Sequence, residues 1–335
     1  MKLKRVIYLG YYIKQLNRTE FLQFLDYTSK VTGKSKVAIV VDMLKSVFIY
    51  NISVLEYFQF RFYKRSKGER KLWAGTGYMY EYQLKMNPRN RRHILEDKTL
   101  FYKNYGDFLI HTVADREDLK NSPAVAETIL TNKSGRLVFK PKEGKCGLDI
   151  EIRRCEEFNR EGLIKYMEIN DYALVEEFLV QHPELKRLSP SGVNTVRIFT
   201  QLNDRDEVII LGCRLRISVN SPVDNMAAGN LAAPIDEDTG RLSGPGVYSD
   251  ITKDERMYHP VTSVKIPGFQ VPFWEETMQM VKHAALHHKE NRSIGWDVVI
   301  TKEGPGLIEG NHDWCKLLWQ LPAKEGLKSA LKQYN

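Results

Sequence analysis

The sequence has few cysteines, no long apolar run and no tract of biased composition, and each absence excludes a class of protein. Its four cysteines are scattered without a C-x-x-C pair or the spacing of zinc ligands, as expected for reduced thiols in the cytosol. The longest apolar runs are far shorter than the roughly 20 residues that span a bilayer. The basic start and short apolar run lack the small-residue cleavage site of a signal peptide. We therefore expect a globular protein that stays inside the cell.

Motifs of several familiar catalytic centres are missing as well. The sequence contains no G-x-S-x-G turn and no local cysteine and histidine signature, so covalent serine or cysteine catalysis is not expected. His283 and His287 have the i, i+4 spacing of two zinc ligands, but no glutamate follows His283 and no third ligand is evident. These histidines are expected to lie on a solvated helix face.

Charge is shared unevenly along the 335 residues. Residues 1–100 contain 20 lysines and arginines against 8 aspartates and glutamates, whereas the remainder contains 30 against 34. The basic, aromatic-rich segment 57–71 is either a solvated helix face or a surface for anionic lipid headgroups, a polyanionic substrate or nucleic acid. The length allows one to three subdomains around a sizeable core.

The apolar spacing predicts a helical first part and a strand-rich remainder. Residues 1 to about 95 repeat apolar side chains at intervals of three and four, and the turn-forming stretch 86–92 marks a boundary. From about residue 135, short Val, Ile and Leu runs between turn residues predict strands. These strands are expected within residues 136–141, 148–154, 172–180, 195–202, 207–218, 295–302 and 305–311. Helices are expected at 273–290 and 323–334.

Two acidic residues face each other in the last predicted hairpin. The turn "TKEGPG" joins the runs "WDVVI" and "LIEGN", and a turn centred near Glu303 places Asp297 opposite Glu309, with Asn311 on the same face. Two carboxylates about 5 Å apart destabilise a hairpin unless a positive charge lies between them. Either one acid points to solvent, or the three oxygen ligands bind Mg²⁺ or Mn²⁺.

A glycine-containing loop follows the strand predicted at residues 136–141. Lys140 ends an apolar run in which an unpaired ammonium group would be unfavourable, so an anion is its natural partner. Gly144 and Gly147 let backbone amides approach phosphate oxygens closely, although their spacing is not that of a Walker A loop. Residues 137–152 are therefore either a phosphate-binding loop or an ordinary surface hairpin.

A third element turns from apolar to acidic near the end of a predicted strand. The run that begins at Asp171 reaches Glu176 and Glu177, whose backbone groups could contact the edge of an adenine ring while Phe178 or Leu179 packs on its face. An edge strand with solvated acids is the alternative.

Together and in this order, these elements resemble the ATP-grasp superfamily, and more closely its sugar-transfer-associated branch, which is related to proteins proposed for teichuronopeptide synthesis. The resemblance covers roughly residues 60–320. It rests on "DKTLFYKNY" (97–105), "LVFKPKEGKCG" (137–147), "VEEFLVQHPEL" (175–185), "SGVNTVRIFT" (191–200), "CRLRISVNSPVDNMAAGN" (213–230), "HPVTSVKIPGFQVPFW" (259–274), "IGWDVVIT" (294–301) and "LIEGN" (307–311). The sequence departs from this branch at Ser263, where glycine is expected, and at residues 312–314, where small residues are expected. These departures concern the acceptor rather than the nucleotide.

The resemblance implies a site for ATP. Lys98 and Lys140 match the two lysines that contact the nucleotide phosphates, and the loop from Gly144 to Gly147 matches the lid that closes over them. Either His182 or Glu184 falls where a polar residue meets the ribose. The matching adenine hinge comprises Glu176, Glu177, Phe178 and Leu179.

The resemblance also implies roles around the metal ion and the acceptor. The matching ligands of one or two Mg²⁺ ions are Asp297, Glu309 and Asn311. The catalytic candidates are Arg214, which matches an arginine that steadies the transferred phosphoryl group, together with Lys140 and Arg197. The candidates for contact with the acceptor are Asn225, Asn230 and His312, although a structural role in loops is an equal alternative for the asparagines.

The expected fold is therefore of the α+β class, an ATP-grasp fold in which two α+β subdomains enclose ATP. We expect a helical basic region over residues 1–95, a lid subdomain over 96–180 and a catalytic subdomain over 181–335. The resemblance implies an ATP-dependent carboxylate-amine ligase that works through an acyl phosphate. Such an enzyme would join an amino acid or other amine to an acidic sugar, free or lipid-linked, of a cell-surface polysaccharide precursor.

Two other functions remain open. A kinase on the same fold would pass the γ-phosphoryl group to a hydroxyl of a sugar or polyol, with His312 or Asp313 as the general base. A non-enzymatic protein would sense ATP and bind its partner through the basic first third. We expect a cytoplasmic protein, with a peripheral membrane contact of its basic region as a further expectation. Nucleic acid is not the expected partner.

Overall fold

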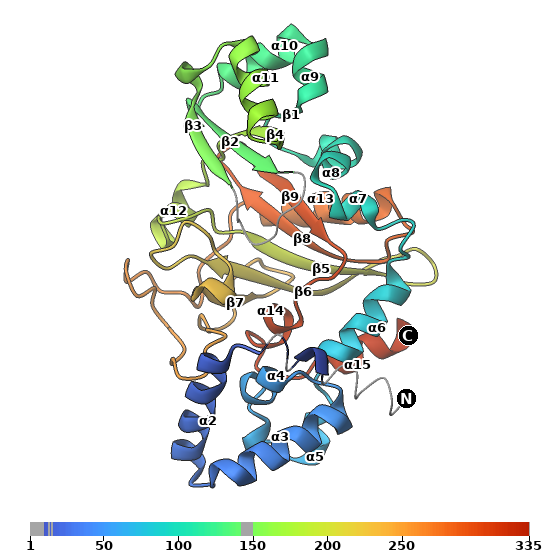
Figure 1. The fold of residues 1–335 in the computed structure, drawn as a ribbon, viewed down its shortest axis with the longest axis vertical. Helices are drawn as coiled ribbons and strands as arrows, with labels where there is room; N and C mark the ends of the chain where they lie inside the picture. The colour runs from blue at the N-terminus through green and yellow to red at the C-terminus, as the bar shows by residue number, and fades with distance from the viewer. Residues whose placement is uncertain (1–9, 13, 15, 142–149, 335) are drawn as a thin grey trace.

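The structure is a computed structural model, and it describes residues 10–12, 14, 16–141 and 150–334. The chain forms three parts that follow one another along its longest axis: N-terminal helices, a five-stranded sheet in the middle and a four-stranded sheet at the far end (Figure 1). Both sheets are antiparallel and both carry helices, which confirms the predicted α+β class.

The N-terminal part is helical, as predicted. It contains α2 (Arg18–Thr32), α3 (Lys36–Tyr50), α4 (Val54–Gln59), the 3-10 turn η1 (Phe62–Lys64), α5 (Lys67–Arg70) and α6 (Thr76–Met86). The side chains of Asn17 and Ser35 begin α2 and α3 by accepting hydrogen bonds from backbone N–H groups in the first turn. Gly33 ends α2 in the left-handed conformation, with φ of 69°. Aromatic side chains from these helices form a hydrophobic core that is distinct from those of the two sheets.

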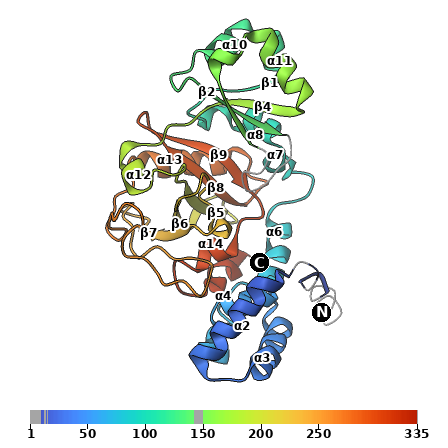
Figure 2. The same ribbon diagram turned by 60° about the vertical axis from the view of Figure 1, so that its left-hand side comes forward.

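The four-stranded sheet has the strand order β1-β4-β2-β3. Its strands are β1 (Val113–Asp115), β2 (Arg136–Pro141), β3 (Glu151–Arg154) and β4 (Tyr172–Glu177). Helices α9 (Arg116–Asn121), α10 (Pro123–Leu130) and α11 (Arg160–Ile169) cover one face (Figure 2). Leu137, Phe139 and Val175 bury their side chains on that face against the helices. Strand β1 was not predicted, because three residues carry no period.

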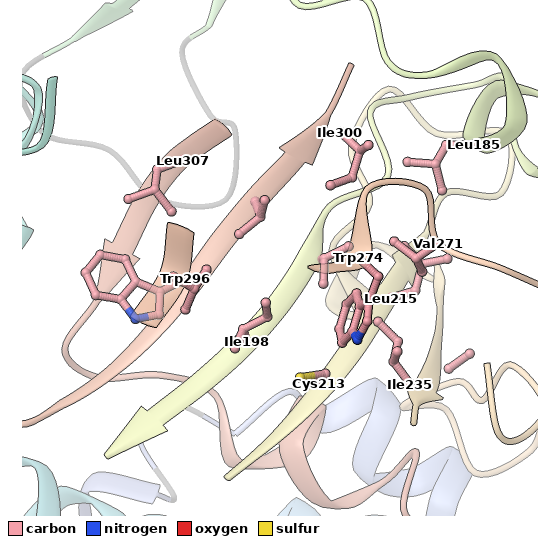
Figure 3. Packing of buried hydrophobic residues seen from close by; sticks show 14 of the residues in the cluster. Leu185, Ile198, Cys213, Leu215, Ile235, Val271, Trp274, Trp296, Ile300 and Leu307 are labelled. Atoms are coloured by element: carbon pink, nitrogen blue, oxygen red, sulfur yellow. The ribbon is translucent and has the colours of Figure 1, made fainter. Parts of the chain in front are cut away.

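The five-stranded sheet has the strand order β7-β6-β5-β8-β9. Its strands are β5 (Val196–Leu202), β6 (Val208–Ile217), β7 (Leu231–Ile235), β8 (Ser293–Ile300) and β9 (Pro305–Asn311). Helix α13 (Trp274–His287) covers one face, and α12 (Pro183–Leu188) lies at its edge. Figure 3 shows Trp296, Ile198 and Leu215 side by side on that face. Strand β7 lies in a segment where the sequence predicted no strand.

The opposite face of the five-stranded sheet packs against helices from both ends of the chain. Tyr82 of α6 shares a hydrophobic core with Phe199, Trp314 and Trp319. The C-terminal helices on this side are α14 (Lys316–Gln320) and α15 (Lys328–Leu331). After α6, the helices α7 (His93–Glu96) and α8 (Lys98–Tyr105) connect to the four-stranded sheet. Only residues 328–331 of the helix expected at 323–334 are α-helical. The division of the chain at residues 95 and 180 stays a prediction.

No membrane-spanning segment was expected from the lengths of the apolar runs. None of the helices in the part of the chain that the structure describes is long and apolar enough to cross a bilayer.

Asn87, at the end of α6, ties the N-terminal part to the central sheet, and its replacement is expected to weaken the fold. Its Nδ2 donates to the carbonyl oxygens of Ser293 at 2.7 Å and His312 at 2.9 Å, and its Oδ1 accepts from the Ser293 N–H. Asn87→Ala should lower the free energy of unfolding by about 2–3 kcal/mol, since it leaves buried backbone groups unpaired. Urea denaturation measures this change.

The matched control is Asn170→Ala. Asn170 ends α11 and also donates from Nδ2 to a backbone carbonyl, that of Tyr166, but it is exposed. We expect a loss of only a few tenths of a kcal/mol there, because water replaces the lost bond. Equal losses in the two variants would contradict the role given to Asn87.

Candidate functional site

A cavity of about 820 Å³ lies where the two sheets approach each other. The four-stranded sheet contributes one wall, the end of β9 contributes another, and α6, α7 and α8 close a third side. The cavity brings together seven of the residues singled out from the sequence, which are Lys98, Lys140, Glu176, Glu309, Asn311, His312 and Asp313.

Lys140 is paired with an acid of its own sheet. Strands β2 and β4 are neighbours, and Lys140 Nζ donates to Glu176 Oε2 at 2.6 Å. His111 Nε2 lies 3.3 Å from the same oxygen. Burial alone would raise the pKa of Glu176, but Lys140 and His111 outweigh it and hold that pKa at about 2. The anion expected beside Lys140 is here the carboxylate of Glu176, so this side chain orients the lysine.

Lys98 reaches the same cavity from helix α8. Asp97 begins this helix by accepting from the backbone N–H of Thr99 at 2.9 Å, and Lys98 is the first helical residue. Burial and the neighbouring Lys140 lower the pKa of Lys98, whereas Glu309 opposes the change. Two ammonium groups from separate elements thus lie close together, an arrangement suited to a polyanion.

The acidic hairpin has the predicted register. Asp297 of β8 lies opposite Glu309 of β9, and Asn311 lies opposite Gly295. Asn311 Nδ2 donates to Glu309 Oε1 at 3.0 Å. Burial and the facing carboxylate of Asp297 raise the pKa of Glu309. Glu309 and Asn311 line the cavity, whereas only 4% of the Asp297 side chain is exposed.

Two arginines from adjacent strands neutralise Asp297. Arg197 of β5 is in register with Asp297, and its Nε and Nη2 donate to both carboxylate oxygens. Arg216 of β6 donates to Asp297 Oδ2 at 2.9 Å and pairs with Asp224 at 2.6 Å. Burial alone would raise the pKa of Asp297, but the arginines hold it well below its usual range. The sheet itself therefore supplies positive charge beside the facing acids, and the binding of a metal ion there stays a prediction.

The surroundings of Glu309 fit a divalent cation. Arg197 and Arg216 face three carboxylates, those of Asp224, Asp297 and Glu309, which leaves one acid in excess beside the cavity. The oxygens of Glu309 and Asn311 are hard ligands of the kind that Mg²⁺ takes alongside water and phosphate oxygens. Both oxygens of Asp297, the third predicted ligand, already accept from arginines. Among the described residues, no three His, Cys, Asp or Glu side chains form a metal cluster.

Arg214 does not belong to this charged group, contrary to its predicted role. Its Nη2 donates to the carbonyl oxygen of Trp319 at 2.7 Å, and its guanidinium folds back over Gly212. It lines a separate cavity of about 490 Å³ beside α14. Arg214 and Arg216 lie two residues apart in β6 and so project from the same face. The sequence "RLR" signals both arginines, but only Arg216 reaches the acidic hairpin.

The predicted adenine hinge lies at the end of β4. Glu176 lines the cavity with its side chain, whereas Glu177, Phe178 and Leu179 do not contribute to its described lining. The guanidinium of Arg136 lies 3.6 Å from the centre of the Phe178 ring. The hinge role of the backbone here stays a prediction.

The two ribose candidates lie elsewhere. His182 begins α12 by accepting from the backbone N–H of Glu184, and Glu184 pairs with Arg187 at 2.8 Å. Both candidates line a different cavity, of about 660 Å³, which also includes Phe269. The structure thus does not bring His182 or Glu184 to the lysines.

The candidates for the acceptor separate into two groups. Asn225 and Asn230 form loop hydrogen bonds: Asn225 accepts from the Ala227 N–H, and the buried Asn230 donates to the carbonyl oxygen of Val223. These contacts give both asparagines structural roles. His312 instead lines the cavity, and its Nε2 lies 2.9 Å from Glu96 Oε1.

The lid loop predicted from the sequence contains two glycines. Gly144 and Gly147 lie outside the residues that the structure describes.

Four residues of the site were not recognised from the sequence, and these are Glu96, His111, Arg216 and Asp224. Only Arg216 had a local signal, its alternation with Arg214. The other three reach the site through contacts between residues that are far apart in the sequence. Glu96 and His312 are 216 residues apart, and Asp224 and Thr195 are 29 residues apart.

Comparisons with solved structures give only distant likenesses. The chain is similar to the biotin carboxylase domain of a 2-oxoglutarate carboxylase from Hydrogenobacter thermophilus, with 15% identity over 69% of this chain and 46% of that one and a TM-score of 0.38. It is similar to a D-cycloserine synthetase, with 12% identity over 74% of both chains and a TM-score of 0.39. It is also similar to an L-amino acid ligase from Bacillus licheniformis, with 13% identity over 66% of this chain and 41% of that one and a TM-score of 0.36.

The chain spans less than half the length of the first and third of these proteins. The TM-scores are too low to support an assignment, and no curated protein matches the chain. A family model does match, over residues 78–335, and it describes the sugar-transfer associated ATP-grasp proteins. This match covers most of the chain and confirms the resemblance seen in the sequence. The protein belongs to the sugar-transfer associated ATP-grasp family.

Proposed function

We propose that this protein is an ATP-dependent carboxylate-amine ligase that activates a carboxylate as an acyl phosphate. The observation that carries the proposal is the shared cavity, in which Lys98 and Lys140 on one side face Glu309 and Asn311 on the other. Membership of the family supports ATP as the nucleotide. The two lysines suit its phosphates, and the oxygens of the hairpin suit the accompanying cation.

Each charged residue of the cavity has a defined task in this proposal. Lys98 and Lys140 bind phosphate oxygens, and Glu176 is a positioning residue that holds Lys140 in place. Glu309 and Asn311 would hold Mg²⁺, which supplies positive charge to the phosphate oxygens. Arg216 does not contribute to the described lining of the cavity but pairs with Asp297 and lies within electrostatic reach of Glu309, so it is a positioning residue that holds Asp297 beside Glu309.

The proposed reaction has two steps. An oxygen of the acceptor carboxylate attacks the γ-phosphorus of ATP, and ADP leaves. The nitrogen of an amine then attacks the carbonyl carbon of the acyl phosphate; inorganic phosphate leaves and the amine loses a proton. Water must be excluded between the steps, because it would hydrolyse the acyl phosphate.

An acidic sugar fits the side of the cavity formed by α7 and the residues after β9. Arg92 and His93 line the cavity there together with the acids Glu96 and Asp313, and the two basic side chains suit an acidic group. Arg92 Nε donates to Glu96 Oε1 at 2.9 Å, so the guanidinium is held in place. The family's association with sugar transfer supports a sugar of a cell-surface polysaccharide precursor, free or lipid-linked, as the acceptor.

One observation favours a kinase as the second candidate. His312 lines the cavity with Nε2 2.9 Å from Glu96 Oε1, an arrangement typical of a histidine oriented as a general base. Such a base would take the proton of a sugar hydroxyl as its oxygen attacks the γ-phosphorus.

Trapping with hydroxylamine separates the two reactions. The protein is incubated with ATP, Mg²⁺ and a panel of acidic sugars, and ADP and hydroxamate are measured together. The ligase yields hydroxamate in proportion to ADP, because hydroxylamine intercepts the acyl phosphate. A kinase yields ADP and a phosphorylated sugar without hydroxamate, and that result would replace the ligase by the second candidate. Absence of ATP consumption with every sugar of the panel would overturn both.

Replacing Glu176 tests the positioning of Lys140. The carboxylate has a pKa of about 2 in the fold and near 4.5 when unfolded, so it stabilises the fold above about pH 4.5 and loses this effect as the pH falls towards 2. Glu176→Gln should therefore lower the free energy of unfolding by roughly 2–3 kcal/mol at pH 7. The difference from the unmodified protein should shrink between pH 4.5 and 2, and the KM for ATP at pH 7 should rise.

Glu184→Gln is the control for this change. Glu184 is also paired with a basic residue, Arg187, but both side chains are about half exposed. We expect almost no change in the free energy of unfolding, because solvent screens this surface pair. A stability difference for Glu176→Gln that does not depend on pH would contradict the ion-pair interpretation.

Replacing Arg216 and Arg214 of β6 in turn tests which of the two arginines supports ADP formation. Arg216→Lys should lower the rate of ADP formation about 100-fold, because lysine lacks the planar fork that bridges Asp297 and Asp224. Arg214→Lys should leave this rate within about a factor of two, since Arg214 only contacts backbone carbonyls. The reverse order of rates would return the role to Arg214. Melting curves of both variants establish that they are folded.

A further inference from the structure

Helix α3 is apolar on two opposite faces, although only one of them is buried. Ile39, Met43 and Val47 pack into the N-terminal core and expose at most 4% of their surface. On the other side, Val37 is 74% exposed and Val41 is 45% exposed. Amphipathic surface helices normally present charged residues at such positions. The outer face of α3 therefore calls for a partner.

Three of the five exposed large apolar residues of α3 form one row, which we call the α3 stripe: Val37, Val41 and Leu44. Their spacing of four and three places them on a single side of the helix. Phe48 lies one turn beyond Leu44 on the same side, and Ile49 lies off the row. Leu44 is 37% exposed. Both views place α3 at the outer end of the N-terminal helices, away from the two sheets (Figures 1 and 2). The stripe thus lies at one extremity of the molecule.

The charges around the α3 stripe include two acids, Asp42 and Asp26, and each of them is paired with a basic residue. Asp42 is the one acid of α3, and it is taken up by Arg70 at 2.8 Å and by the hydroxyl of Tyr57 at 2.8 Å, on the side of the helix that faces α4 and α5. Lys45, next to Leu44 in the sequence, is exposed, and Lys36, which begins the helix, pairs with Asp26 of α2 at 2.5 Å. Residues 1–100 as a whole carry a surplus of 12 positive charges.

We propose that the α3 stripe docks this protein on an anionic lipid surface, with α3 lying in the plane of the headgroups. Apolar side chains enter the boundary of the acyl chains while neighbouring lysines meet anionic headgroups, which is the composition of an interfacial helix. A second copy of the chain fits less well, because it would bring two stripes bordered by lysine against each other. A lipid surface satisfies both the apolar and the basic residues.

This contact is independent of the ligase reaction, and it fixes how the molecule faces the membrane. The stripe lies on the N-terminal helices, and the four-stranded sheet is at the opposite end of the long axis (Figure 1). Docking through α3 leaves that sheet away from the lipid. Because three side chains bury little area, the binding is reversible and needs both the apolar and the charged contributions.

Sedimentation with vesicles tests the proposal on the full chain. Vesicles that contain about 30% phosphatidylglycerol in phosphatidylcholine supply the anionic surface, and pure phosphatidylcholine vesicles supply the neutral one. The unmodified protein should bind the anionic vesicles, and added salt should weaken this binding. Val37→Ser combined with Leu44→Ser should lower the partition coefficient about tenfold. Lys45→Ser should lower it by a smaller factor.

Two variants on α11 are matched controls. Ile169 is 71% exposed and Lys165 is exposed, but both lie on the four-stranded sheet's covering helix. Ile169→Ser and Lys165→Ser should bind vesicles as the unmodified protein does. Melting curves establish that every variant is folded, since all these side chains are exposed.

Several outcomes would overturn the proposal. These are unchanged binding of the double variant, equal binding to neutral and anionic vesicles, and failure of the folded unmodified protein to bind either kind. Light scattering, which measures the oligomeric state, would show one further contradicting outcome. If the unmodified protein is a dimer that Val37→Ser with Leu44→Ser converts to a monomer, the stripe is a contact between copies rather than a lipid surface.

Discussion

The site depends on one buried ionic contact, that of Asp297 with Arg197 and Arg216. The three residues come from β8, β5 and β6, so the contact joins three strands of the central sheet through their side chains. A buried charge group of this kind is tolerated only with good geometry, and removal of one partner leaves an uncompensated charge. With Asp297 satisfied inside the sheet, the neighbouring Glu309 and Asn311 are left to face the cavity.

A second ionic contact performs the same task on the opposite wall. Lys140 and Glu176 bind each other within the four-stranded sheet, and the lysine still borders the cavity. Both walls therefore hold charged side chains in position through acids or bases of their own sheet. Groups arranged in this way need little reorganisation when charge develops on a substrate, which is the usual source of electrostatic stabilisation in enzymes.

The two sheets border the cavity, whereas the N-terminal helices form a separate hydrophobic core. The four-stranded sheet packs helices on one face and the five-stranded sheet packs them on both. Charged residues of each sheet border the cavity, which helices α6 to α8 close. The N-terminal helices have a separate core and take no part in the described cavity lining before α6. Their exposed apolar face is thus free of constraints from the reaction, which allows it to serve attachment.

The sequence by itself determined the α+β class, the helical N-terminal part, most strands and the facing of Asp297 and Glu309. These features depend on periodicity and on one short turn, which are local. Three decisions belonged to the tertiary structure: the choice of Arg216 over Arg214, the pairing of Lys140 with Glu176, and the removal of His182 and Glu184 from the site. Each depends on strand order and on side-chain direction between segments distant in the chain, and no local pattern records either.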